Sequence, residues 1–280
     1  MHSSPCAFVG FDSAWTDNPR APGAVCALVT RADGPPAFHA PQLATFAHAL
    51  AFIRAIQKTS RLTLIALDQP TIVTNTESLR PVERVAASLV SWLGGGVQPS
   101  NRGRMGMFCD AAPIWSFLNS LGAIEDPEAA RIASDGLYLM EVFPAISMPS
   151  LSAEFFGRLA APRYNPARRK TFKASDWTKV TIALAEKFAE FKFPEPAQWL
   201  RMTTHLPRVS KADQDCLDAM VCLWIALHWR LKDRRESLVI GGKDTGYMVL
   251  PAIEGARLRL TAAAKRAVSG VRAYGTDLVD

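Results

Sequence analysis

Two short apolar segments that each end on an aspartate constrain the fold of this chain more than any other feature. The first covers residues 8–12 and ends on Asp12; the second covers residues 62–68 and ends on Asp68. Apolar runs of this length predict buried strands, and Pro70 cannot continue a central strand. Each predicted strand therefore carries a carboxylate to the edge of a sheet.

The connection between the two segments predicts that the strands are parallel. Between residues 41 and 60, apolar side chains recur at the three- and four-residue spacing of an amphipathic helix: Leu43, Phe46, Ala47, Leu50, Ile53 and Ile56. A strand, helix, strand crossover favours parallel pairing. Asp12 and Asp68 would then meet at one sheet edge, where like charges repel unless a cation lies between them.

The remaining pattern predicts an α/β fold in a single domain over residues 1–280. Residues 24–30 and a brief segment at 37–39 would form an antiparallel meander with the first strand, and residues 136–143 a further strand. A helical insertion is predicted at about 71–131. The strongest helix prediction covers residues 211–230, and no domain boundary is evident.

Three more acids are candidates for a functional site. Glu141 stands in an otherwise apolar strand, where a carboxylate must reach solvent, a partner or a cation. Asp215 and Asp218 are three residues apart on the predicted helix and therefore share a face. Acids in a first helical turn also favour the helix dipole, which is a sufficient role for Asp213 and Asp215 but not for Asp218.

Basic residues in two predicted loops are candidates for binding phosphate groups. Arg102 and Arg104 lie in the predicted insertion, and Arg168, Arg169 and Lys170 lie in the most basic stretch of the chain, residues 163–173. This stretch is either a solvated loop or a clamp for a nucleic-acid backbone, in which Tyr164 and Phe172 would stack on bases.

A run of three glycines resembles a phosphate-binding loop only superficially. Residues 94–96 lack the Gly-Lys-Ser/Thr ending of a P-loop and the glycine spacing that follows a strand in dinucleotide-binding folds.

Composition narrows the class of protein only a little. The formal net charge of +6 fits a polyanionic partner but is equally common among metabolic enzymes. The five cysteines show no spacing typical of a zinc site, and no apolar run is long enough to span a membrane. With no signal-peptide pattern at the start, the expected location is cytoplasmic, with no membrane partner.

Several motifs, taken in order, resemble those of a known family. The matching segments are Gly10–Trp15, Ala66–Pro70, Arg80–Arg84, Met140–Pro144, Tyr164–Pro166 and Asp215–Ala219. The chain is similar to proteins catalogued as domain of unknown function number 429, which are predicted nucleases of the ribonuclease H-like superfamily. The resemblance implies a mixed five-stranded sheet, its first three strands antiparallel, flanked by helices. Many resolvase-like enzymes of the superfamily carry glutamate where this chain has Asp68.

The hypothesis from the sequence is metal-dependent phosphodiester hydrolysis. Two Mg²⁺ or Mn²⁺ ions roughly 4 Å apart would be bound by Asp12, Asp68, Glu141, Asp215 and Asp218. The basic residues would hold nucleic acid or another phosphodiester. Which acids contact metal, whether the substrate is DNA, RNA or a small phosphorylated molecule, and the oligomeric state are left open.

Two other functions are compatible with the same fold. One is a non-catalytic nucleic-acid-binding or scaffold protein, since a fold does not determine a function. The other is phosphoryl transfer on a nucleotide, as in actin-like kinases. Those enzymes need a second lobe and glycine-rich phosphate hairpins, neither of which is recognisable here.

Overall fold

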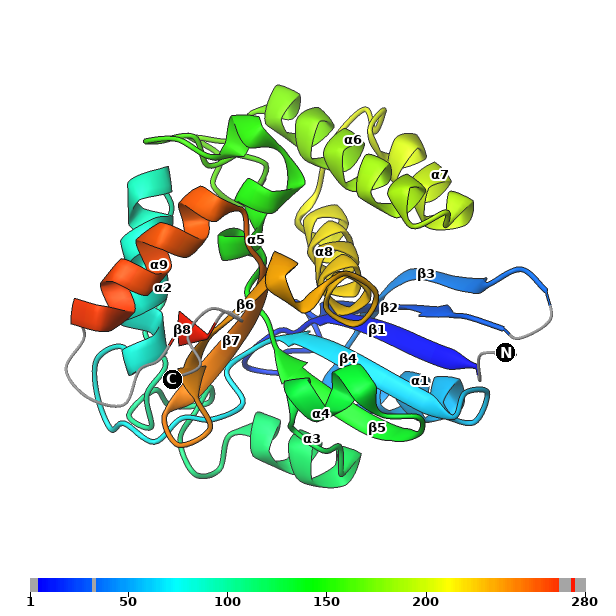
Figure 1. The fold of residues 1–280 in the computed structure, drawn as a ribbon, viewed down its shortest axis with the longest axis horizontal. Helices are drawn as coiled ribbons and strands as arrows, with labels where there is room; N and C mark the ends of the chain where they lie inside the picture. Colours follow the sequence, from blue (N-terminus) through cyan, green and yellow to red (C-terminus); the bar gives the residue numbers. More distant parts are fainter. Residues whose placement is uncertain (1–4, 32–33, 267–272, 275–280) are drawn as a thin grey trace.

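The structure is a computed structural model that describes residues 5–31 and 34–266 and the backbone of residues 273–274. Its central sheet has five strands in the order β3-β2-β1-β4-β5, and a smaller sheet has the order β7-β6-β8 (Figure 1). The strands are β1 (Cys6–Asp12), β2 (Gly23–Val29), β3 (Ala37–Ala44), β4 (Leu62–Asp68), β5 (Gly136–Glu141), β6 (Ser237–Gly242), β7 (Gly246–Pro251) and β8 (Ala273–Tyr274).

Helices surround both sheets. They are α1 (Phe46–Gln57), α2 (Pro81–Leu93), α3 (Pro113–Leu121), α4 (Pro127–Ile132), α5 (Pro144–Leu151), α6 (Ala174–Glu190), α7 (Pro194–Thr203), α8 (Lys211–Leu231) and α9 (Glu254–Arg266), with short 3-10 turns at Ala153–Phe155 and Arg234–Glu236. None of the helices within the described residues is long and apolar enough to cross a membrane. Residues 1–4, 32–33, 267–272 and 275–280 lie outside the described residues.

The strand pairing confirms a mixed α/β sheet. β1 pairs antiparallel with β2, and β2 pairs antiparallel with β3. β1 pairs parallel with β4, which pairs parallel with β5. In the register of β1 and β4, Asp12 lies directly opposite Asp68. The crossover through α1 thus brings the two strand-ending aspartates to one edge, as the sequence pattern predicts.

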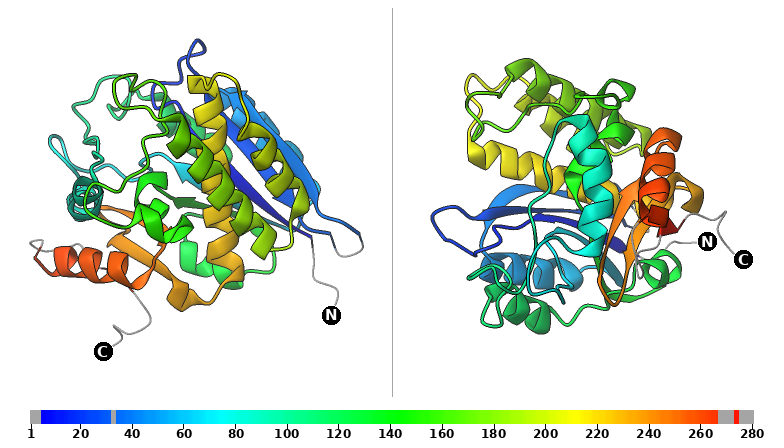
Figure 2. Two further views of the ribbon diagram at one scale, coloured as in Figure 1. Left: turned by 90° about the horizontal axis from the view of Figure 1, so that it is seen from above. Right: turned by 90° about the vertical axis from the view of Figure 1, so that its left-hand side faces the viewer.

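The central sheet is covered on both faces. α8 lies across one face, with α6 and α7 packed outside it, and α1 and α3 cover the other (Figures 1 and 2). The smaller sheet packs with α2 and α9 in a separate hydrophobic cluster. The site-bearing edge of the central sheet therefore faces a second layer built from α2, α5 and β7.

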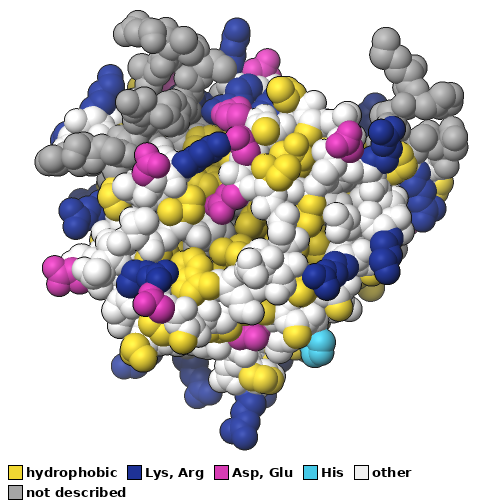
Figure 3. Space-filling model, turned by 90° about the horizontal axis from the view of Figure 1, so that it is seen from below, with side chains coloured by type: hydrophobic (Ala, Val, Ile, Leu, Met, Phe, Trp, Pro, Cys, Tyr) yellow, Lys and Arg dark blue, Asp and Glu magenta, His cyan; other side chains and the backbone are white. Residues whose placement is uncertain are grey.

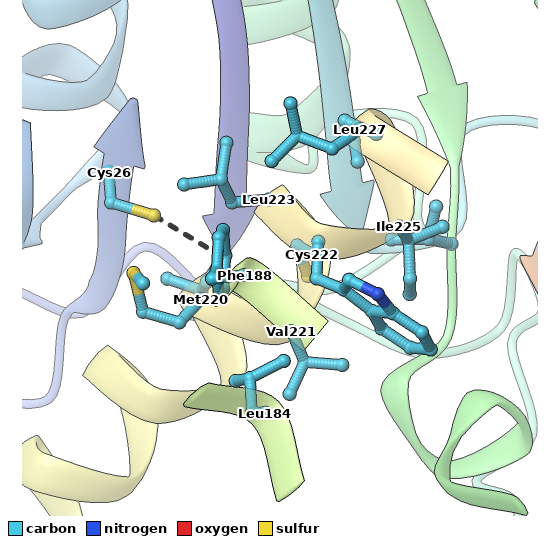
Figure 4. Packing of buried hydrophobic residues seen from close by; sticks show 14 of the residues in the cluster. Cys26, Leu184, Phe188, Met220, Val221, Cys222, Leu223, Ile225 and Leu227 are labelled. Carbon is cyan, nitrogen blue, oxygen red and sulfur yellow. Dashed lines mark hydrogen bonds between the residues drawn. The ribbon is translucent and has the colours of Figure 1, made fainter. Parts of the chain in front are cut away.

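α8 approaches the sheet closely because β1 has a glycine beneath it. A Cβ atom on Gly10 would lie 2.1 Å from the carbonyl oxygen of Ala219 and 2.4 Å from the backbone nitrogen of Leu223. The neighbouring Cys26 thiol donates a hydrogen bond of 3.4 Å to the same carbonyl of Ala219 (Figure 4). Residues 219–227 of the helix are all buried, because α6 packs on the side away from the sheet.

The predicted boundary between the third strand and the first helix was wrong. β3 continues to Ala44, and α1 starts at Phe46 with Thr45 as its N-cap. Residues 42–44 pair with β2, and their outward side chains are exposed, as on an edge strand. Pro41 is tolerated there because an edge strand needs no donor on its outer side.

Several elements were not predicted from the sequence, among them α5, α7 and β6. Pro194 starts α7, because the first helical residue needs no backbone N–H. β6 is too short and too glycine-rich at its end to be evident, and its pairing with β7 defines it.

The segment predicted as an insertion at 71–131 is divided between two cores. α2 packs against β6, β7 and α9, whereas α3 packs against α1 under the central sheet. The loop between α2 and α3 contains Arg102 and Arg104. The segment therefore joins the two hydrophobic layers.

We predict that Gly10→Ala destabilises the fold by about 3 kcal/mol or more, because the added methyl group collides with backbone atoms of α8 that cannot move alone. The urea midpoint of the variant measures this loss. Gly96→Ala is the matched control, since a Cβ atom there meets no heavy atom within 4 Å. Equal midpoints for the two variants would contradict the close contact between α8 and β1.

Candidate functional site

Four aspartates converge where α8 passes over the ends of β1 and β4. Asp12 and Asp68 end the two strands, and Asp215 and Asp218 lie in the first turns of α8. Burial is nearly complete for three of them, with exposed fractions of 9% for Asp12 and 7% each for Asp215 and Asp218. All four line one cavity of about 820 Å³.

The start of α8 is fixed by a capping box, which sets the direction of its acids. The Ser210 hydroxyl accepts a hydrogen bond from the backbone N–H of Asp213, and the Asp213 carboxylate accepts one of 2.8 Å from the backbone N–H of Ser210. Asp213 therefore has the capping role that acids in a first turn often have. One turn further on, Asp218 faces the strand ends instead.

The carboxyl groups of this cluster resist ionisation. Burial, followed by repulsion from neighbouring acids, raises the pKa of Asp12 and of Asp68 well above the ordinary aspartate value. Burial also raises the pKa of Asp215. The crowding is therefore unfavourable for the folded protein at neutral pH unless positive charge enters the cluster.

The carboxylate of Asp218 is held in place by two side-chain hydrogen bonds. Its carboxylate accepts a hydrogen bond of 2.7 Å from the Tyr164 hydroxyl and another from the Gln214 side-chain amide. Burial raises its pKa to about 6, and these two hydrogen bonds oppose a larger rise. Asp218 is consequently charged at neutral pH.

One cation already reaches the cluster from within α8. The Lys211 ammonium group donates a hydrogen bond to the Asp215 carboxylate. Burial alone would lower the pKa of Lys211, but this hydrogen bond and the charges of Asp12, Asp215 and Asp218 raise it. Lys211 therefore stays charged and partly balances the acids, a role that the sequence reasoning did not assign.

Glu141 is held in a different interaction from the four aspartates. Arg80 donates hydrogen bonds of 2.9 Å and 2.5 Å to its two carboxylate oxygens, and the backbone N–H of Thr71 donates one of 3.0 Å. Arg80 also contacts Glu83 at 2.9 Å, and both Arg80 and Glu141 are completely buried. Although Glu141 borders the cavity, its oxygen atoms are occupied, so the structure gives it a supporting position.

Of the five basic residues predicted to bind substrate, Arg168 alone lines the cavity. Arg102 is bound to Asp110 and stacks on Trp115, and Arg104 donates a hydrogen bond of 3.1 Å to the carbonyl of Pro99. Arg169 and Lys170 are exposed outside the cavity.

Three other cations line the cavity: Arg20, Arg163 and Lys211. Arg163 belongs to the basic stretch proposed from the sequence as a phosphate clamp, whereas Arg20 and Lys211 were missed. Tyr164, expected to stack on a base, binds Asp218 instead. The hydrogen bond from Gln214 to Asp218 was also not predicted. Its only signal in the sequence is the four-residue spacing of the two residues, which makes them neighbours on a helix surface.

The face of the molecule drawn in Figure 3 carries mixed charge. Lysine and arginine side chains lie mostly around its margin with acidic side chains between them, while hydrophobic atoms gather towards the middle. Among the residues that the structure describes, this face therefore shows no continuous basic stripe for a nucleic-acid duplex.

The donor atoms of the cluster suit a hard divalent cation. Carboxylate oxygens are the preferred ligands of Mg²⁺ and Mn²⁺, and four carboxyl groups surround one space. Across residues 5–31 and 34–266, no three His, Cys, Asp or Glu side chains are already placed as a metal-binding group. Metal binding would thus require some of these aspartates to turn.

We predict that Asp68→Asn stabilises the metal-free protein, and more so at pH 8 than at pH 5. The folded-state pKa of Asp68 lies above its unfolded value, so its favourable contribution exists at low pH and is lost as the pH rises through the folded pKa. At pH 8 in EDTA, we expect the variant to melt at a higher temperature than wild type. Each kcal/mol gained in the free energy of unfolding corresponds to a rise of about 2–4 °C. A variant less stable than wild type at pH 8 would contradict the repulsion.

We predict that substitution of Glu141 leaves the affinity for Mn²⁺ nearly unchanged, whereas substitution of Asp12 weakens it. Glu141→Gln should lower the melting temperature, since breaking a buried pair costs about 3–5 kcal/mol, while Mn²⁺ affinity stays within about threefold in whatever protein remains folded. Asp12→Asn should leave the fold intact and weaken Mn²⁺ binding more than tenfold. Calorimetric titration with Mn²⁺ measures both. Loss of Mn²⁺ binding in folded Glu141→Gln would show that Glu141 is a ligand after all.

A comparison with known protein families covers most of the chain. The model of the family described as a protein of unknown function, DUF429, matches residues 10–244. No curated protein and no solved structure matches the chain. The matched span contains all five acids named from the sequence and ends before β7. The chain therefore belongs to the DUF429 family.

Proposed function

We propose that this protein is a metal-dependent phosphodiester hydrolase of the nuclease type. The observation that carries the proposal is the meeting of four aspartates in one cavity, two from adjacent parallel strand ends and two from the helix that crosses them. Such clusters are costly without a cation, and phosphodiester hydrolysis is a reaction for which paired divalent cations are used.

The topology supports a ribonuclease H-like arrangement. The central sheet has three antiparallel strands followed by two parallel ones, and the acids lie at the carboxyl ends of its first and fourth strands. The smaller sheet and α9 are additions to that arrangement. Ligands of sheets with parallel strands bind beyond the carboxyl ends, which is where the cavity lies.

Mg²⁺ or Mn²⁺ would be held by Asp12, Asp68, Asp215 and Asp218, and would supply Lewis acidity and a bound water of lowered pKa. The Tyr164 hydroxyl keeps Asp218 in one orientation.

Gln214 would hold Asp218 in one orientation together with Tyr164. The Gln214 side-chain amide donates a hydrogen bond to the Asp218 carboxylate. The side-chain oxygen of Gln214 is buried without a hydrogen-bond partner among the described residues, which is unfavourable.

The phosphate groups of the substrate would be held by exposed cations at the cavity. Arg20 and Arg163 come from loops that precede β2 and α6, and Arg168 from the basic stretch proposed from the sequence. A guanidinium group can donate two parallel hydrogen bonds to two oxygens of one phosphate. The positive charge of these arginines would thus offset the negative charge of the phosphate as it approaches the aspartates.

Phosphoryl transfer on a nucleotide is less well supported. The glycine run at 94–96 does line the cavity, but Gly94 is the C-cap of α2. The C-terminal end of a helix carries partial negative charge and repels phosphate. A phosphate-binding loop requires the opposite end of a helix.

The test is a Mn²⁺ titration of wild type and of the Asp12→Asn, Asp218→Asn double variant, with DNA and RNA cleavage followed in parallel. We expect wild type to bind Mn²⁺ and to cut, EDTA to abolish cutting, and the double variant to lose at least 10³-fold in rate, the order for groups that organise a metal site. Arg104→Gln, a charge-removing substitution outside the cavity, is the control and should retain activity.

A wild-type protein that neither binds Mn²⁺ nor cuts would refute the hydrolase. Nucleic-acid binding that persists equally in wild type and double variant, without cleavage, would favour the non-catalytic binding protein. Circular dichroism of the double variant confirms that it is folded.

A further inference from the structure

We propose that the cavity accepts one unpaired nucleotide at a time, with its base against an apolar wall opposite the aspartates. This inference rests on the proposed function and adds the substrate class: single-stranded nucleic acid or a nucleotide displaced from a duplex.

The lining of the cavity has two chemically different parts. Asp12, Asp68, Asp215 and Asp218 form the acidic part with Lys211. One apolar part comes from the end of α2, from α5 and from β7, and includes Val90, Leu93, Pro144, Ala145, Met148 and Met248. Other apolar side chains of the lining, such as Trp15 and Leu43, lie nearer the ends of β1 and β3. A ligand that fills the cavity must therefore carry a charged group and an apolar group on one small framework.

The dimensions exclude a duplex from the acids. The cavity of about 820 Å³ is in the range of small-molecule sites, and the acids in it are less than a tenth exposed in three of four cases. A phosphate in an intact duplex lies on a broad, stiff surface and cannot reach such depth. Enzymes that act inside a pocket take the nucleotide out of its stack or use single strands.

The positions of the cations indicate where the rest of the strand would lie. Arg20, Arg163 and Arg168 line the cavity yet are exposed residues, so they can contact phosphates outside it. The acidic part would bind the scissile phosphate together with the metal. The exposed arginines would bind the phosphates next to it along the strand. The apolar part is then left for the base, whose flat faces are suited to such a wall.

The glycine run gives the apolar wall an open surface. Gly94, Gly95 and Gly96 lie between Leu93 and Val97 at the cavity, and a Cβ atom on Gly96 would meet nothing within 4 Å. Because the φ angle of Gly96 is not positive, a larger side chain can be placed there without backbone strain. Gly96→Trp would therefore add a large ring at the border of the cavity, where it competes with a base for the apolar wall, and would not alter the four aspartates.

The experiment compares substrates with Mn²⁺ present. A single-stranded oligonucleotide, the same strand with abasic residues placed one at a time, and a closed dumbbell duplex without ends are tested as DNA and as RNA. We expect single strands to be cut at least tenfold faster than the dumbbell. One abasic position beside the scissile phosphate should raise KM about tenfold, as loss of one base contact does.

The variants locate the base. Gly96→Trp should raise KM for the normal strand to the abasic level, with Mn²⁺ affinity unchanged, while Arg104→Gln, outside the cavity, should behave as wild type. Equal cleavage of dumbbell and single strand, or no abasic effect at any position, would overturn the inference and leave the hydrolase standing. Trp15 also lines the cavity, so an abasic effect that disappears in Trp15→Leu but persists in Gly96→Trp would overturn the placement of the base on the apolar wall.

If no strand is cut, the proposed hydrolase fails and binding decides the inference alone. Calorimetry then compares thymidine 3′,5′-bisphosphate with deoxyribose 3,5-bisphosphate, which lacks the base. Tighter binding of the thymidine compound, lost in Gly96→Trp, supports the wall as a base site. Equal binding of the two compounds refutes it.

Discussion

The contact between α8 and β1 at Gly10 determines the geometry of the site. Because no side chain separates the helix backbone from the strand, Ala219 and Leu223 lie directly on the sheet. Asp218, one residue before Ala219, is thereby held beside Asp12 and Asp68. Any side chain at position 10 would collide with the backbone of α8 and push apart the two pairs of acids. The electrostatic character of the cavity thus depends on an apolar packing contact.

A second constraint comes from the buried ion pair between Arg80 and Glu141. The guanidinium group also donates a hydrogen bond to the carbonyl of Ile72, and the backbone N–H of Glu141 donates one to the hydroxyl of Tyr247 in β7. These contacts tie the loop after β4, the start of α2 and the smaller sheet to the central sheet. Removing one partner would leave a buried charge uncompensated, so the network specifies how the two layers meet.

Strand ends and long helices could be predicted from the sequence because their signals are local. Apolar runs indicated β1 and β4, helical spacing indicated α8, and the crossover indicated that Asp12 and Asp68 share an edge. The pairing of Glu141 with Arg80 could not be predicted, since 61 residues separate them and only the fold brings them together. The same reason explains why Arg20 was missed while Arg102 was named: charge is visible in a sequence, but its distance from a cavity is not.

The two parts of the cavity lining belong to different sections of the chain. The acids come from the ends of β1 and β4 and from α8, whereas the apolar wall comes from α2, α5 and β7. Of the wall residues named above, only Met248 lies beyond the span matched by the family model. Substitutions in the apolar wall would leave the charges of the aspartates unchanged. The acidic and apolar parts of the cavity are therefore physically separable in this architecture, so that one acidic cluster can be combined with differently shaped walls by changes in a neighbouring layer.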